Sequence, residues 1–434
     1  MMSRNLLSIE KLFNIFAIFF ITLMPFGIGP TARYLLSLSA IVFSFLILRQ
    51  HGMGVVSLKT CFSTYVFKAL LLWNIFAIIS IFFSPEPLYS LRVYFSEFFL
   101  NSFLFTALYV LGASTKELPL KWKSVLLWSN SIFLVFYLGS MAIWYLMPGS
   151  FFMGDKELIE RFISTRTDII FEFGRTCELF HGIHHTSLYL ALMIAFWSVL
   201  PFKNILLNLF FLSINFLTLL TTTRRGALLA CLLGLIFSQK IVQKQRVGTN
   251  IIVGLLLLAS ITVGVIVSDR GKHFVREDWR LISQGQIDKA KNLGGSIPLR
   301  ISTYKEFLKE IAYQPFMPRG IGKKLIKEYW KPLIERAGLQ HGHNTFINQA
   351  FYLGLQGAAA LLAIITLQCV MLWKAIKLAS FDEKQFLRVA LVFIFIYWVT
   401  NLFTDAFRHD SASLYWFFTA IATGRALRIT RAHV

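Results

Sequence analysis

Apolar runs long enough to cross a bilayer constrain this chain more than any other feature. A membrane-spanning helix needs about 20 mostly apolar residues, and shorter runs suffice where the helix is tilted or buried. The sequence contains about twelve such runs. They cover residues 13–26, 34–48, 67–83, 98–111, 126–147, 186–200, 205–220, 226–237, 251–267, 344–373, 386–403 and 411–423. We therefore expect an all-α integral membrane protein with about twelve transmembrane helices.

The composition agrees with that fold and excludes several other classes of protein. Of 434 residues, 56% are hydrophobic and 15% are charged, and the mean hydropathy is +0.63. An ordinary soluble domain has about 25% charged residues, so a soluble enzyme, a disordered chain and a disulfide scaffold are all excluded. The four cysteines, Cys61, Cys177, Cys231 and Cys369, form no CxxC pair and imply no metal site.

The net charge of +21 follows mainly from topology. Cytoplasmic loops of membrane proteins collect Lys and Arg, and the basic residues fall in alternate loops when both termini are placed in the cytoplasm. An even number of spans is consistent with this N-in, C-in arrangement. The excess charge therefore gives no reason to expect a nucleic-acid partner.

Two segments on the opposite side of the membrane are long, residues 148–185 and residues 269–343. The second is a large loop that divides the chain into three parts, namely residues 1–268, 269–343 and 344–434. Within it, residues 304–311 show the apolar periodicity of an amphipathic helix. Residues 323–331 have the composition of a helix that lies on an anionic bilayer surface. For both stretches the alternative is a helical lid that packs on the bundle.

Arginines near the ends of spans are the first candidates for chemistry. Arg224 and Arg225 follow three threonines and lead directly into the run 226–237. A guanidinium holds two oxygens of a phosphate or diphosphate at once and keeps its charge, although arginines also merely cap spans. Arg300, which precedes the amphipathic stretch, is by itself equally consistent with a solvated charge.

Polar residues also flank the last spans. His343 and Asn344 lead into the run 344–373. A histidine at such a place serves as a base near neutral pH, because neighbouring arginines keep its imidazole neutral. Asp405 and Arg408 occupy the short loop between the last two spans. Asp405 either orients a histidine or arginine or simply ends a helix.

Motifs for metals and nucleotides are weak or missing in the sequence. His181, His184 and His185 have no acidic or cysteine partner at the spacing of metal ligands, so we expect no metal site. The P-loop, Gly-x-Gly-x-x-Gly and Gly-x-Ser-x-Gly motifs are absent. We therefore expect chemistry without a cofactor or a nucleotide.

The segment His343-Asn344, followed after nine residues by Gly354-x-x-Gly357, resembles the HN-x9-GxxG signature of the O-antigen ligase (WaaL) family. The other candidates occur in the order of that family, namely Arg225 before Gly226-Ala227, Arg300 with Tyr304, His343, and Asp405 with Arg408. The resemblance covers about residues 186–410. The same superfamily contains Wzy-type O-antigen polymerases and protein O-oligosaccharyltransferases.

The resemblance implies an inverting glycosyltransferase of GT-C-like architecture in the inner membrane of a Gram-negative bacterium, with a periplasmic active site. It implies a donor glycan on undecaprenyl diphosphate, an acceptor hydroxyl on the lipid A core, and neither metal nor nucleotide. Arg225 and Arg300 would stabilise the leaving diphosphate, and His343 would accept the proton of the acceptor. The residues implied to bind substrate are Arg224, Tyr304, Asn344, Asp405 and Arg408.

Proteins with other functions share some of these features. The Arg-x10-Gly pattern of the polymerases is missing from the large loop, and we expect no large soluble domain after the last span. Both observations favour a ligase over a polymerase or a protein oligosaccharyltransferase. A flippase for lipid-linked glycans would need charged residues at mid-span in both leaflets, whereas the candidates here gather at one face.

Overall fold

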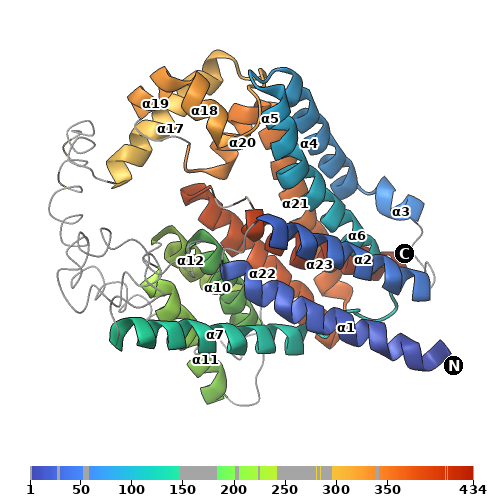
Figure 1. Ribbon diagram of the computed structural model, residues 1–434. Helices are drawn as coiled ribbons and strands as arrows, with labels where there is room; N and C mark the ends of the chain where they lie inside the picture. Colours follow the sequence, from blue (N-terminus) through green and yellow to red (C-terminus); the bar gives the residue numbers. More distant parts are fainter. Residues whose placement is uncertain are drawn as a thin grey trace.

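A computed structural model describes most of the chain, and the described residues form helices and connecting turns without a strand. These residues are 2–26, 30–51, 58–146, 183–200, 205–222, 225–241, 280, 284, 296–337, 342–405, 407 and 409–433. The elements are α1 (Met2–Leu23), η1 (Met24–Phe26), α2 (Pro30–His51), α3 (Leu58–Ser63), α4 (Tyr65–Phe82), α5 (Pro87–Val93), η2 (Tyr94–Phe99), α6 (Leu100–Ser114), α7 (Trp122–Leu146), α10 (Ile183–Val199), α11 (Ile205–Thr221), α12 (Arg225–Ile241), α17 (Ser296–Tyr313), α18 (Lys323–Tyr329), α19 (Lys331–Ala337), α20 (Thr345–Leu353), α21 (Leu355–Leu378), α22 (Phe381–Phe403) and α23 (His409–Ala432). Figure 1 shows their arrangement.

Within the described ranges, seven helical stretches are long and apolar enough to cross a membrane. They are Ile9–Phe26, Thr31–Gln50, Tyr65–Phe82, Pro87–Ser114, Trp122–Ile143, Leu355–Leu378 and Phe381–Phe403, and the shorter apolar helices α10, α11 and α12 accompany them. The predicted span 411–423 lies inside α23, which is almost entirely buried. The predicted span 251–267 lies outside the described residues. The expected all-α membrane protein is confirmed.

The prediction of one continuous span over residues 344–373 is wrong, because the segment is divided at Gly354. Helix α20 ends at Leu353 and α21 begins at Leu355, with Gly354 between them at φ +77°. A Cβ on Gly354 would lie 2.6 Å from side-chain atoms of Gln356, and side chains other than glycine rarely adopt this backbone conformation. Apolar residues continue on both sides of the break, so hydropathy gives no sign of it.

Two glycines let α6 and α23 pack with their backbones in contact. A Cβ on Gly112 would lie 2.4 Å from the carbonyl oxygen of Ile421, and a Cβ on Gly424 would lie 2.1 Å from that of Tyr109. Small residues allow this close approach between membrane helices, where packing replaces the hydrophobic effect as the main source of association. The α6–α23 pair therefore forms a tightly fixed part of the bundle.

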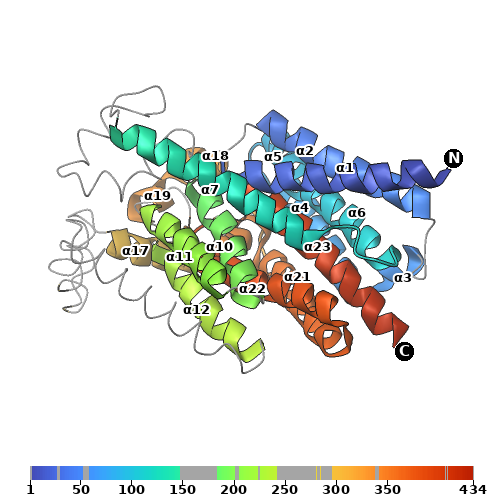
Figure 2. The ribbon, with the colours of Figure 1, turned by 90° about the horizontal axis from the view of Figure 1, so that it is seen from below.

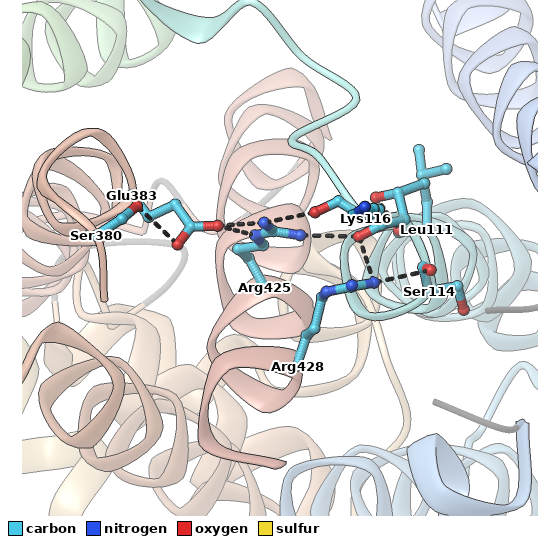
Figure 3. Close-up of polar contacts among 8 residues, drawn as sticks. Leu111, Ser114, Lys116, Ser380, Glu383, Arg425 and Arg428 are labelled. Atoms are coloured by element: carbon cyan, nitrogen blue, oxygen red, sulfur yellow. Dashed lines mark hydrogen bonds and ion pairs between the residues drawn. The ribbon is translucent and has the colours of Figure 1, made fainter. Parts of the chain in front are cut away.

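A buried ionic cluster joins three helices near the end of α23. Arg425 donates from Nη1 to the carbonyl of Thr115 at 2.8 Å, from Nη2 to that of Lys116 at 2.9 Å, and from Nε to Oε1 of Glu383 at 2.7 Å. Arg428 donates to the same Thr115 carbonyl at 2.7 Å. Figure 3 shows this Arg425 cluster, which consists of Arg425, Arg428 and Glu383. The two arginines complement the negative carboxyl end of α6. Through Glu383, Arg425 also joins this end of α6 to the start of α22.

Helices α17, α18 and α19 form a cap at the end of the molecule opposite the start of α1 and the end of α23 (Figures 1 and 2). The apolar side chains of the cap are buried in protein, including Phe307 on α17 and Leu325 and Ile326 on α18. The lid alternative from the sequence therefore describes α18 better than a helix lying on the bilayer surface.

The turn before α18 fastens the cap to α4 and α5. The backbone N–H of Ile321 donates to Oγ of Ser90 at 3.1 Å, and that of Gly320 donates to Oγ of Ser80 at 3.1 Å. Lys324 of α18 forms an ion pair with Glu86 at 3.1 Å. One side of the cap is thus attached to the N-terminal spans, while its other side meets α22.

Candidate active site

Several of the candidate residues meet at the carboxyl end of α22. The last carbonyl groups of a helix have no partners inside the helix. Here the carbonyls of Leu402 and Phe403, which we call the α22 end, accept hydrogen bonds from other segments. The donors are Arg300 and Tyr304 of α17 and Asn344, which precedes α20. Residues separated by 58 to 103 positions in the sequence are thereby brought together.

Arg300 connects the cap to the α22 end. Its Nη1 donates to the carbonyl of Phe403 at 2.9 Å, and its side chain is half-buried. The positive guanidinium also complements the negative end of the helix dipole. The expectation that Arg300 precedes the amphipathic helix is wrong, because α17 already begins at Ser296. Proline is tolerated in the first turn of a helix, so Pro298 does not delay its start.

Tyr304 lies one turn after Arg300 and bridges two further segments. Its hydroxyl oxygen is 3.2 Å from the carbonyl oxygen of His343 and 3.2 Å from that of Leu402. Burial raises the pKa of the Tyr304 phenol, against a smaller lowering by Arg300. The hydroxyl therefore stays protonated at physiological pH and acts as a donor toward these carbonyls.

His343, the predicted base, has an unusual backbone conformation. Its φ of +44° makes it the single non-glycine residue in the left-handed region within the described ranges. This conformation costs an L-residue about 1–2 kcal/mol, and such strain is concentrated at functional sites. The preceding Gly342 donates its N–H to Oδ1 of Asn348 at 2.8 Å, so the turn is fixed on that side.

Asn344 uses both ends of its amide. Its Oδ1 accepts hydrogen bonds from the backbone N–H groups of Phe346 at 2.8 Å and Ile347 at 3.2 Å, which makes it the N-cap of α20. Its Nδ2 donates to the carbonyl of Leu402 at 3.0 Å. The His-Asn pair of the signature therefore consists of a strained turn followed by a residue that starts α20 and ties it to α22.

Asp405 lies just beyond α22 and is buried. Its Oδ1 is 3.4 Å from the hydroxyl of Thr345, which also lies 2.7 Å from Oδ1 of Asn401. Asp405 is therefore adjacent to the first residue of α20, one position after Asn344. This places the carboxylate within the same group of segments.

The start of α12 lies against the α22 end. A Cβ on Gly226 would be 2.7 Å from Cβ of Phe403, so the glycine of the Arg-Gly-Ala motif permits close contact here. The backbone of Arg225 opens α12 at this point. The Arg225 side chain, together with Arg224 and Arg408, lies outside what the structure describes.

Sequence reasoning missed Arg319, which is buried between the cap and α20. Its Nη2 donates to the carbonyl of Glu310 at 2.8 Å and its Nη1 to that of Met317 at 3.1 Å, and its guanidinium carbon lies 5.0 Å from the centre of the Phe351 ring. It thus closes the carboxyl end of α17. Its place in a Pro-Arg-Gly turn between two amphipathic stretches was the available signal, but the many basic residues of the loop obscured it.

The described residues include no group of three or more His, Cys, Asp or Glu side chains that could hold a metal ion. Of the histidine cluster considered from the sequence, His185 accepts the backbone N–H of Ser411 on its Nδ1 at 3.2 Å. His181 lies outside the described residues.

An apolar groove with a volume of about 610 Å³ begins beside the α22 end. It runs between α12, α20, α21 and α22, with Phe346 and Leu402 at one end and Trp373 and Lys374 at the other. Along α22 it extends from Leu391 to Leu402, or about 17 Å at the rise of an α-helix. That length corresponds to roughly one leaflet of a bilayer.

A family comparison agrees with this arrangement. A model of the O-antigen ligase family matches residues 209–362, which extend from α11 into α21. Over this segment the chain is similar to the O-antigen ligase family. The segment includes Arg300, Tyr304, His343 and Asn344, and it stops before Asp405. The family resemblance expected from the sequence is confirmed, while a comparison with curated proteins finds no match.

Proposed function

We propose that this protein is an O-antigen ligase, an inverting and metal-independent glycosyltransferase. It moves a glycan from undecaprenyl diphosphate to a sugar hydroxyl of the lipid A core. The observation that carries the proposal is the meeting of Arg300, Tyr304, His343 and Asn344 at the α22 end, within the segment that the O-antigen ligase family model matches. The flippase alternative gives no role to a strained histidine turn that Tyr304 ties to the helix end held by Arg300.

In the proposed reaction, the acceptor oxygen attacks the anomeric carbon from the side opposite the diphosphate. The bond from the anomeric carbon to the diphosphate oxygen breaks, and its electron pair leaves with undecaprenyl diphosphate. The proton of the acceptor hydroxyl passes to the imidazole of His343. The configuration at the anomeric carbon is inverted, and each atom and charge is accounted for without a metal or a nucleotide.

The developing charge of the diphosphate sets the main electrostatic demand. Fixed guanidinium groups stabilise such charge without titrating, which is the role proposed for Arg300 and Arg225. The carboxyl end of a helix would by itself repel an anion. At the α22 end, however, Arg300, Tyr304 and Asn344 donate to the exposed carbonyls, which makes this surface compatible with a diphosphate.

The surroundings suit two lipid substrates in one membrane. We assign the polyprenyl chain of the donor to the apolar groove that starts at Leu402. Arg224, Asp405 and Arg408 are assigned to substrate binding beside the reacting groups. The protein would lie in the bacterial inner membrane with both termini in the cytoplasm, so that the cap and the α22 end face the periplasm.

The test uses purified protein in liposomes with undecaprenyl-diphosphate glycan, lipid A-core and excess EDTA, without nucleotide. Wild type is compared with His343→Asn, because asparagine tolerates the left-handed backbone better than most residues. His433→Asn in the C-terminal tail serves as the matched control. Transfer that withstands EDTA and falls to a small residual rate only in His343→Asn supports the proposal.

Other results would assign another function. Lengthening of the donor glycan without transfer to lipid A-core would indicate a polymerase, and transfer to a protein would indicate an oligosaccharyltransferase. Movement of the donor between leaflets without any covalent product would indicate a flippase. The covalent products are distinguished by gel electrophoresis and mass spectrometry.

A further inference from the structure

The backbone at His343 is held by contacts on both sides. Gly342 is fixed by Asn348, and Asn344 is fixed by its cap of α20 and by its bond to Leu402. Between these two residues, the carbonyl of His343 meets the hydroxyl of Tyr304 at 3.2 Å. A left-handed residue persists only where its surroundings determine it, so these contacts decide where the imidazole is presented.

Tyr304 is the contact that reaches His343 from a separate element. It extends from α17 of the cap, 39 positions earlier in the chain, and its hydroxyl is also 3.2 Å from the carbonyl of Leu402. One hydroxyl hydrogen is thus shared between the strained turn and the α22 end. The bridge fixes the turn relative to Arg300, which donates to the next carbonyl along α22.

We propose that Tyr304 is a positioning residue. Its hydroxyl fixes the position of the left-handed turn at His343 relative to Arg300 and the α22 end. It acts through His343 and not by transferring a proton or by gripping the glycan. The expected effect on kcat rests on the proposed function. The effect of Tyr304 on the exposure of His343 is measurable without turnover.

The kinetic test is a double-mutant cycle of Tyr304→Phe and His343→Asn, with Tyr313→Phe as the control. Tyr313 lies on the same helix and is 80% exposed. Small displacements of a reacting group cost up to about a hundredfold in rate, so Tyr304→Phe should lower kcat by about tenfold to a hundredfold and leave KM nearly unchanged. In the His343→Asn background, the same substitution should have no further effect.

The second measurement follows modification of His343 by diethyl pyrocarbonate, with mass spectrometry, in membranes before extraction. Tyr304→Phe should change the modification rate at His343, leave that at His433 unchanged, and leave the melting temperature close to wild type. Unchanged kcat, an additive cycle or an unchanged rate at His343 would overturn the inference. A changed rate at His343 in a protein without transferase activity would uphold the positioning role and reject the proposed function.

Discussion

Under the proposed function, Arg300 combines two electrostatic tasks in one side chain. A guanidinium has five N–H donors in a planar fork, and Arg300 commits one of them to the Phe403 carbonyl. That bond fixes the orientation of the plane, so the remaining donors have a defined direction before any anion arrives. Preorganised donors of this kind lower the energy of a transition state because they need no rearrangement during the reaction.

Arg300→Lys should therefore impair transfer almost as strongly as Arg300→Ala. An ammonium group is a point charge and cannot bind a carbonyl and a diphosphate with one fixed fork. We expect kcat to fall by about 10² to 10³, as for loss of other charge-stabilising donors. The measurement is initial transfer rates in liposomes, with Arg336→Lys, which alters an exposed ion pair with Glu306 on the same cap, as the control. Full activity of Arg300→Lys would show that transfer does not need the planar guanidinium group.

At this scale the sequence predicted which of these residues lie close together but not their contacts. Motif order placed Arg300, Tyr304, His343 and Asn344 in one site, and the structure brings these four together. Arg300, Tyr304 and Asn344 share the backbone carbonyls of Leu402 and Phe403 as partners, and His343 is joined to them through Tyr304. A carbonyl group has no signature in the sequence. The left-handed φ of His343 was equally invisible, because histidine is not a residue that marks such turns as glycine does.

Among the helices, α6 and α23 show how steric fit replaces the hydrophobic effect in lipid. Gly112 and Gly424 each face a carbonyl oxygen of the partner helix at a distance that leaves no room for a methyl group. A substitution here must separate the two helices or distort one of them. The surrounding aromatic packing would then be disturbed as well.

Gly424→Ala should consequently lower the melting temperature, since overpacking costs about 1–3 kcal/mol. Gly139→Ala in α7 is the matched control, because a Cβ there meets nothing within 4 Å. In a helix, alanine is favoured over glycine by about 0.5–1 kcal/mol, so the control should be neutral or slightly stabilising. Thermal unfolding in detergent measures both, and equal behaviour of the two variants would contradict the packing argument.

The start of α22 offers a comparison between a buried ion pair and an exposed one. Glu383 pairs with Arg425, whose side chain is 7% exposed, whereas the adjacent Asp382 pairs with Lys123, and these two side chains are 73% and 44% exposed. Glu383→Gln should destabilise by about 3–5 kcal/mol, because it leaves a buried cation without its counter-ion. Asp382→Asn should cost at most about 1 kcal/mol. Chemical denaturation of both variants distinguishes these values.

Hydropathy predicted most of the described helices, and its failure between α20 and α21 has a definite cause. Periodicity reports which faces are apolar, and the apolar character continues past Gly354 without interruption. The break depends on the positive φ of Gly354 and on the cap supplied by Asn344. Gly354, the first glycine of the signature, ends α20.

For the molecule as a whole, the candidate site and the chain termini lie at opposite ends (Figure 2). With the proposed topology, a cysteine at Tyr313 in the cap should react with a membrane-impermeant thiol reagent from the periplasmic side. A cysteine at Arg431 should react only after the membrane is permeabilised. The wild-type protein controls for the native cysteines, of which Cys61 and Cys231 are buried. The opposite labelling pattern would show that the cap faces the cytoplasm and the end of α23 faces the periplasm.

Helix α22 connects the two ends of the molecule, with Glu383 in the Arg425 cluster near its start and the candidate site at its last residues. Its 23 residues span about 34 Å, close to the roughly 30 Å hydrocarbon thickness of a bilayer. A rod anchored at both ends cannot shift freely when lipid chains become shorter or longer. Because the contacts of Arg300 lie at one end of this rod, a change in bilayer thickness would act on the candidate site through α22.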